Sequence, residues 1–116
     1  MGVDLTLMPL LSQDYWAAHD VIRLERRREL WGDINALPQQ EIPQPVHCYM
    51  ARDKDGETCY GDAETTAYGD KMKWTTAADL LTLKDHEAVQ DNWMNRAVWA
   101  YLAVMPPKWK IILYWH

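Results

Sequence analysis

Phenylalanine is missing from this sequence, while Trp occurs seven times and Tyr six times in 116 residues. The large aromatic side chains therefore all carry N–H or O–H groups, which need partners in a core and also suit binding surfaces. Long apolar runs are missing too, since no window approaches the about eighteen residues of a membrane span, and the N-terminal MGVDLTLMPLL lacks the charged start of a signal peptide. We therefore expect a cytosolic protein that does not insert into a membrane.

Cysteine is scarce: only Cys48 and Cys59 are present, one on each arm of a predicted β-hairpin. The register of that hairpin decides their geometry. If Arg52 pairs with Glu57, the cysteines share a face but lie on a diagonal at or beyond the reach of a disulfide. If Asp53 pairs with Glu57, they point to opposite faces. Both registers favour two free thiols.

Motifs for metal, phosphate and acyl chemistry are also missing. The four histidines lack the spacing that places two ligands on one helix face, and neither cysteine belongs to a CxxC pair. The segment DKDGE fails as a calcium loop, because Ala51 would stand at the first ligand position and Asp62 at the twelfth. No GxSxG, Walker A or GxGxxG pattern occurs. The sequence thus gives no catalytic residue, metal ligand or cofactor site, and it favours a protein that is not an enzyme.

Positive charge is in deficit, with a net charge of −5. Acidic side chains outnumber basic ones between Asp53 and Asp91, whereas residues 92–116 contain no acidic side chain. This balance disfavours direct binding of nucleic acid, which depends on neutralising phosphates. The basic run of residues 26–28 is flanked by Glu25 and Glu29, which can pair with it on a helix.

Residues 1–116 have the length of a single domain. Near the start, Val3, Leu5 and Leu7 alternate with Asp4 and Thr6, which predicts a strand buried on one face.

The final segment, WKIILYW, also predicts a strand, but it places apolar side chains on both faces of that strand. Ile111 and Leu113 fall on one face, and Ile112 and Tyr114 on the other. This pattern predicts an interior strand covered twice, and we expect it to lie in the same sheet as the first strand.

Between these ends the pattern from His19 to Ala36 fits either one long helix or a strand followed by a helix. We favour a strand near residues 19–25 and a helix near 26–36, because Ile22 and Leu24 suit one face of a strand and Pro38 stops the helical spacing after it. The stretch PQQEIPQP that follows predicts an extended connector.

The segment VHCYMARDKDGETCYGD predicts two strands around a turn in which Gly56 takes the left-handed conformation. Thr76 and Asp79 form a weak capping box that opens a short helix through Leu83, and Asp85 can cap a helix that runs to about Val104. The apolar stripe expected on that last helix is Val89, Trp93, Ala97, Ala100, Tyr101 and Val104. Together these elements predict the α+β class: a small mixed sheet of about four or five strands, including both termini, with two or three helices packed mainly on one side.

Two groups of polar residues remain as a candidate binding site, one near the first helix and one after the hairpin. If the second folds over the first, arginine forks and tyrosine hydroxyls can hold an anionic small molecule or an acidic loop of a partner. The alternative is that the same residues pair with one another on the surface. The candidate binding residues are His19, Arg23, Arg26, Arg27, Tyr60, Asp62, Tyr68, Asp70 and Trp74.

Tyr-Gly-Asp occurs twice within YGDAETTAYGD, at residues 60–62 and 68–70. The first copy ends the hairpin, so we expect its glycine to release the chain from the sheet. The second copy is expected in a loop ahead of a helix, with Tyr68 exposed. The two contexts differ, which disfavours a duplicated ligand-binding motif.

Three segments, MGVDLTLMPL, AYGDKMKWTTAADLLTL and AVWAYLAVMPPKWKIILYWH, resemble a group of small uncharacterised accessory proteins of tailed phages and prophages. The resemblance implies a protein of the bacterial host cytoplasm, and it carries over no catalytic residue. The function it implies is binding of a host or phage protein, for example inhibition of a host defence system. The alternative is a binding module or enzyme for nucleotides or other anionic small molecules.

Overall fold

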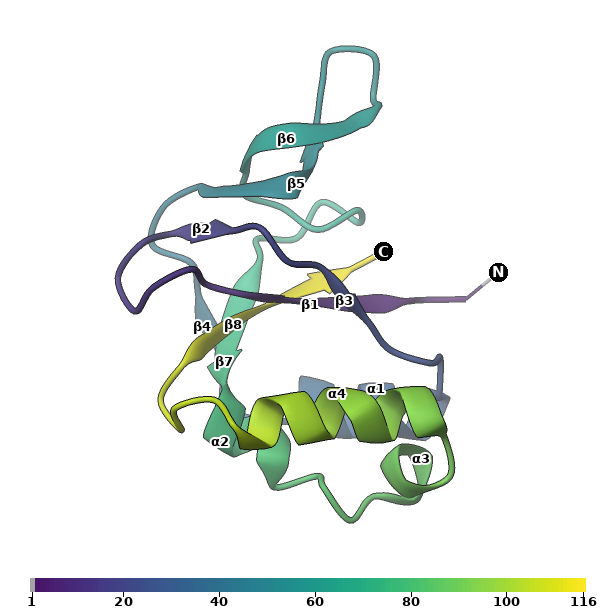
Figure 1. The fold of residues 1–116 in the computed structure, drawn as a ribbon. Helices are drawn as coiled ribbons and strands as arrows, with labels where there is room; N and C mark the ends of the chain where they lie inside the picture. Colours follow the sequence, from purple (N-terminus) through teal and green to yellow (C-terminus); the bar gives the residue numbers. More distant parts are fainter. Residues whose placement is uncertain (1) are drawn as a thin grey trace.

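Three layers make up the fold of residues 2–116, the part of the chain that this computed structural model describes (Figure 1). The middle layer is a five-stranded sheet in the order β3-β1-β8-β7-β4, and every neighbouring pair in it is antiparallel. Helices cover one face of this sheet and a smaller sheet covers the other. The strands of the middle layer are β1 (Leu5–Pro9), β3 (Ile22–Arg23), β4 (Gln40–Glu41), β7 (Lys73–Thr76) and β8 (Lys110–Trp115).

The smaller sheet has three strands in the order β2-β5-β6. They are β2 (Ala17–Ala18), β5 (Val46–Arg52) and β6 (Thr58–Ala63), with β2 parallel to β5 and β5 antiparallel to β6. The predicted α+β class is confirmed. The predicted sheet of about four or five strands that includes both termini is confirmed by the middle layer, although its strands are all antiparallel and not mixed. A second sheet was not predicted; it forms because the β5–β6 hairpin pairs with the short strand β2 and not with the strands of the middle layer.

Strand β8 explains how the layers hold together. Its Ile111 and Leu113 pack in the core between the middle sheet and the helices, while Ile112 and Tyr114 pack in the core between the two sheets. All four are 0–1% exposed. The predicted interior strand, covered on both faces and paired with the first strand, is therefore confirmed.

The first strand is more deeply buried than its alternation predicts. Every residue of β1 is buried, including Thr6, which was expected on an exposed face. Thr6 lies opposite Tyr114 in the register of β1 and β8, and its hydroxyl is hydrogen-bonded to Nε2 of His116 at 2.8 Å. The hydroxyl therefore has a partner, which lowers the cost of burying it.

The segment from His19 to Ala36 is a strand followed by a helix, as favoured from the sequence. It contains β3 and helix α1 (Arg28–Asn35), whose buried side chains are Leu30, Trp31 and Ile34. The proline-rich connector that follows includes the two residues of β4, which pair with β7 at the edge of the middle sheet.

The capping box at Thr76 is confirmed. Its Oγ1 accepts a hydrogen bond from the backbone N–H of Asp79 at 3.2 Å and opens the short helix α2 (Ala77–Leu81). The next cap is His86 and not Asp85: Nδ1 of His86 accepts from the N–H of Ala88 at the start of α3 (Glu87–Gln90).

The long helix predicted from Asp85 to about Val104 is wrong, because a second cap interrupts it. Oδ1 of Asn92 accepts from the N–H of Asn95 at 3.0 Å and starts a separate helix, α4 (Trp93–Ala103). The interruption changes which face is buried, so Trp93 is 69% and Val104 84% exposed, contrary to the predicted stripe. The buried residues of α4 are Asn95, Val98, Trp99 and Leu102.

The β5–β6 hairpin is confirmed, with Gly56 at a φ of +79° in its turn. Arg52 pairs with Thr58, and Asp53 donates its N–H to the carbonyl of Glu57, so the turn has the second of the two predicted registers. The expectation that this register places the cysteines on opposite faces is wrong, because a bulge between Cys48 and Ala51 shifts the pairing and Cys48 lies opposite Gly61, two residues from Cys59 on the same face. Both thiols are free, Cys48 buried and Cys59 half-buried. Among residues 2–116, no helix has the length and apolar character needed to cross a bilayer.

Candidate functional site

The structure does not gather the candidate residues into one site. His19, Tyr60 and Asp62 meet on the small sheet, whereas Arg26, Tyr68 and Asp70 line a groove beside the middle sheet. The predicted folding of the second group over the first is thus realised in part, since an arginine and a tyrosine of the two groups share one groove. Two separate surfaces follow from this.

The first surface lies on the outer side of the small sheet and is here called the tyrosine–histidine cluster: His19, His47, Tyr49, Tyr60 and Asp62. The alternation of β5 builds it, because Val46 and Cys48 pack inward while His47 and Tyr49 point outward. A bulge in β5 follows Cys48, and β6 supplies Tyr60 and Asp62 from across the hairpin.

Tyr60 lies at the centre of the cluster. Its ring centroid is 4.3 Å from that of His47, 4.4 Å from that of Tyr49 and 5.4 Å from that of His19. Its hydroxyl is hydrogen-bonded to Nε2 of His19 at 2.5 Å. Nδ1 of His47 donates to Asp62 at 2.8 Å, so the polar ends of the cluster are fixed as well as its rings.

The cluster is accessible despite these internal contacts, since Tyr49 is 48% and Tyr60 39% exposed. The surrounding side chains desolvate the phenol of Tyr60 and raise its pKa, and the neighbouring Tyr49 acts in the same direction. A phenol with a raised pKa stays neutral at physiological pH and is a poor nucleophile. The arrangement is suited to aromatic contact and hydrogen bonding.

A shallow hollow of about 470 Å³ adjoins the cluster and shares His47 and Asp62 with it. Tyr15 stands at its rim and is 59% exposed. The side chain of Asp14, also in the lining, is 96% exposed. The hollow thus combines an aromatic wall with carboxylates that face solvent.

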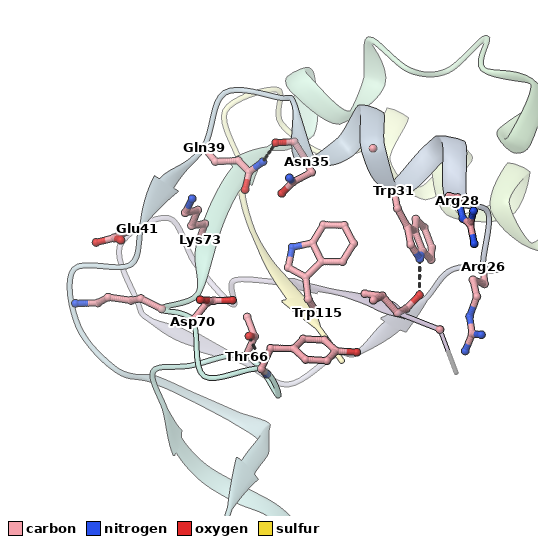
Figure 2. Close-up of a pocket in the computed structure, with 15 residues that line it drawn as sticks. Arg26, Arg28, Trp31, Asn35, Gln39, Glu41, Thr66, Asp70, Lys73 and Trp115 are labelled. Atoms are coloured by element: carbon pink, nitrogen blue, oxygen red, sulfur yellow. Dashed lines mark hydrogen bonds between the residues drawn. The ribbon is translucent and has the colours of Figure 1, made fainter.

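The second surface is a groove of about 1200 Å³, here called the tryptophan groove (Figure 2). Trp115, from the end of β8, lies at its centre in Figure 2, and Trp31 of α1 stands beside it with the ring centroids 6.1 Å apart and the planes at 81°. Tyr68 and Thr66 contribute from the loop before β7, and Asn35 and Gln39 from the end of α1 and the connector.

Basic side chains outnumber acidic ones in the tryptophan groove. Arg26, Arg28, Lys71 and Lys73 line it, against Glu41 and Asp70. Figure 2 shows the two arginines and Lys73 on opposite sides of Trp115. A chain of net charge −5 therefore has a groove whose lining carries an excess of positive charge.

Arg26 is held by Asp4, with Nε and Nη2 donating to the two carboxylate oxygens at 2.8 and 2.9 Å. The hydrogen bonds lower the pKa of Asp4 and raise that of Arg26. In contrast, Arg28, Lys71 and Lys73 form no salt bridge or side-chain hydrogen bond with any residue of the described chain, 2–116. Three cations of the groove are therefore uncompensated.

The remaining candidates lie apart from both surfaces. Arg23 pairs with Thr6 across β3 and β1. Arg27 reaches Asp91 at 3.6 Å, so it pairs on the surface with a residue outside the candidate set. Trp74 is half-buried.

Trp74 packs near Trp16, with ring centroids 6.4 Å apart, and Nζ of Lys110 lies 5.4 Å from its ring. Trp16 and Trp74 pack against the core between the two sheets, whereas Tyr15 and Tyr68 are exposed.

The two Tyr-Gly-Asp copies differ as expected, but the first does not end a strand. Gly61 lies inside β6 opposite Cys48, so the prediction that it releases the chain from the sheet is wrong. Gly69 has a φ of +88° in a turn closed by the pairing of Thr65 with Lys71. The second turn directs Tyr68 into the lining of the tryptophan groove.

Sequence reasoning missed much of both surfaces. His47 and Tyr49 alternate with buried residues of β5, so outward position on the strand was an available signal. Arg28, Lys73 and Trp115 carry no shared motif, because they come from helix α1, from β7 and from β8, which are separate parts of the sequence. Their proximity depends on the tertiary structure alone.

No group of three or more His, Cys, Asp or Glu side chains in the described chain could hold a metal ion. Comparisons with protein-family models, with curated protein sequences and with solved structures give no match for this chain. The assignment of function therefore depends on the two surfaces.

Proposed function

We propose that this chain is a phage-encoded protein that acts in the bacterial cytoplasm by binding a partner protein through the tyrosine–histidine cluster. The observation that carries the proposal is the exposed contact of Tyr49 and Tyr60 with two histidines on the outer side of the small sheet. Tyrosines held in place by neighbours provide contact area at a low entropic cost, which is why they are enriched among residues that dominate binding energy.

The partner is expected to present basic side chains to this surface. Asp14 and Asp62 are 96% and 71% exposed beside the cluster, and the chain as a whole carries −5. An arginine can pair with such a carboxylate while its planar guanidinium stacks on a tyrosine ring. Complementary charge also speeds the encounter of the two proteins.

The phage origin and the nature of the partner rest on the resemblance of the three sequence segments. We infer a partner from the bacterial host, of which a component of a defence system is the example to test. Binding without catalysis is sufficient for such a role.

The test uses affinity capture from a lysate of the bacterial host with three forms of the chain. The wild type is compared with Tyr49→Ser/Tyr60→Ser and with Tyr101→Ser, whose tyrosine is 45% exposed on α4, outside the cluster. We expect one partner to be retained by the wild type and by Tyr101→Ser but lost by the double variant. Loss of two hot-spot tyrosines weakens binding by about thirtyfold or more.

Circular dichroism of each variant confirms that the fold is kept. Equal capture by all three forms would show that the cluster is not the docking surface. For the defence role, we expect expression of the wild type, but not of the double variant, to raise plaque formation by a phage that the host restricts. Unchanged plaque formation with the wild type would contradict that role.

A further inference from the structure

We propose that the tryptophan groove is a separate binding site for a nucleotide, that is, for a small molecule that joins a planar heteroaromatic ring to phosphate. This site goes beyond the protein-binding function, and it uses none of the residues of the tyrosine–histidine cluster.

The charge of the groove selects an anion. Four basic residues face two acidic ones in the lining, and Arg28, Lys71 and Lys73 have no ionic partner within residues 2–116. Positive charge concentrated in a concave surface attracts anionic ligands more strongly than the same charge on a convex one. Arg28 also offers the planar fork that suits phosphate oxygens.

The centre of the groove selects a ring. Trp115 is half-buried there, with Trp31 set edge-on to it (Figure 2). Tyr68 adds a third aromatic ring to the lining. Any nucleotide base can stack on an aromatic side chain, and each such stack contributes about 1–3 kcal/mol to the free energy of binding. Inorganic anions gain nothing from the indole, so the same groove should favour a nucleotide over phosphate.

Polar side chains around the rings suit the rest of such a ligand. Asn35 has no side-chain hydrogen bond within the described chain, and it points over Trp115 in Figure 2. Its amide carries both donors and an acceptor, which is what the edge of a base requires. The carboxylates of Glu41 and Asp70 are acceptors for the hydroxyls of a sugar.

The test measures binding of ATP, GTP, adenosine and inorganic triphosphate to the full chain by calorimetry and by the indole N–H signals in NMR spectra. We expect a nucleotide to bind more tightly than adenosine or triphosphate, and to shift the indole signals of Trp115 and Trp31. The indole signal of Trp93, which is 69% exposed on α4, should not move.

A matched pair of variants locates the site. Lys71→Glu changes a cation of the groove, and Lys108→Glu makes the same change at an exposed position outside it. We expect Lys71→Glu to weaken nucleotide binding about tenfold or more, as charge reversal near a phosphate implies, and Lys108→Glu to leave it within about twofold.

Absence of binding by both nucleotides at millimolar concentration would overturn the proposal. Equal affinities of the two variants, or equal affinity of the wild type for triphosphate and nucleotide, would overturn it as well. The affinity-capture experiment has an independent outcome, since its variants lie outside the groove.

Discussion

Asn95 is a buried polar side chain that binds the backbone of Glu25, directly before Arg26 of the tryptophan groove. It is 0% exposed in α4. Its Oδ1 accepts the N–H of Glu25 at 2.8 Å, and its Nδ2 donates to the carbonyl of Ala88 at 3.0 Å. A longer bond from Nδ2 reaches the carbonyl of Glu25 at 3.4 Å. One amide thus joins α4, α3 and the segment that leads into Arg26 and Arg28.

We expect Asn95→Ala to lower the free energy of unfolding by about 2–3 kcal/mol. Each of the two short hydrogen bonds contributes about 1 kcal/mol net, and the buried carbonyl of Ala88 loses its side-chain donor, which adds a cost of about 1 kcal/mol or more. The N–H of Glu25 lies nearer the surface, so a water molecule can replace part of the hydrogen bond that it loses. Against a total stability of about 5–15 kcal/mol for a domain, this is a large change.

The assay is urea denaturation of the wild type, Asn95→Ala and Asn35→Ala. Asn35 is an exposed asparagine without a side-chain hydrogen bond inside the described chain, and its replacement should change the stability by less than about 0.5 kcal/mol. A loss below about 1 kcal/mol for Asn95→Ala, or equal losses for the two variants, would refute the reasoning.

Asn95→Asp tests the donor separately. The new carboxyl keeps an acceptor for Glu25, but its second oxygen faces carbonyls of Ala88 and Glu25, which repel the anion and raise its pKa in the folded state. The folded protein then binds more protons than the unfolded chain at intermediate pH. Relative to the wild type, the variant should gain unfolding free energy as the pH falls from 7 to 5, and a relative loss would contradict the geometry.

Two further predictions follow from titratable groups. Burial lowers the pKa of His116 in the folded protein below its ordinary value of 6.5. At a pH between the folded and the unfolded pKa, the unfolded chain therefore binds more protons than the folded one. The unfolding free energy of the wild type should therefore fall relative to that of His116→Gln as the pH is lowered from 7.5 to 5; a difference independent of pH would refute the shift. Burial also raises the pKa of Cys48, whereas Cys59 is half-buried. A maleimide reagent should label Cys59 in the native protein and Cys48 only as fast as the protein unfolds, and rapid labelling of both would contradict the buried position of Cys48.

The ends of the fold were predictable from the sequence, and the helices after Asp85 were not. Residues 109–115 carry apolar side chains on both faces, and both faces are buried only in an interior strand of a sheet that is covered on both sides. The local pattern and the tertiary structure therefore agree there. For α4 the assumption of one continuous helix fixed the phase of the apolar stripe at Val89. The cap at Asn92 starts a new helix, so the buried face of α4 is not the one that continues from Val89. Asn95 lies on that buried face, and because it is polar it does not look like a core residue in the sequence.

The candidate surfaces were predictable only in fragments. Tyr60 and His19 were both identified from the sequence, but their contact depends on the parallel pairing of β2 with β5. Strand β2 has only two residues, so the sequence shows no alternation there that would predict it. Isolated exposed cations such as Lys71 carry no local signal, because their meaning arises from neighbours distant in sequence. The alternation of β5 did contain His47 and Tyr49, and outward residues of a strand buried on one face are a signal that can be used.

The pairing of β1 with β8 has a consequence for how the protein is made. Leu7 lies opposite Leu113, so the central pair of the middle sheet joins residues from the two ends of the sequence. Strand β8 also separates β1 from β7, which leaves the earlier strands without their common neighbour until it is synthesised. Folding during translation therefore cannot complete the middle layer, and the helices have no finished sheet to pack on before β8 leaves the ribosome. Contacts of such long sequence separation also slow folding, since a large loop must close before they form.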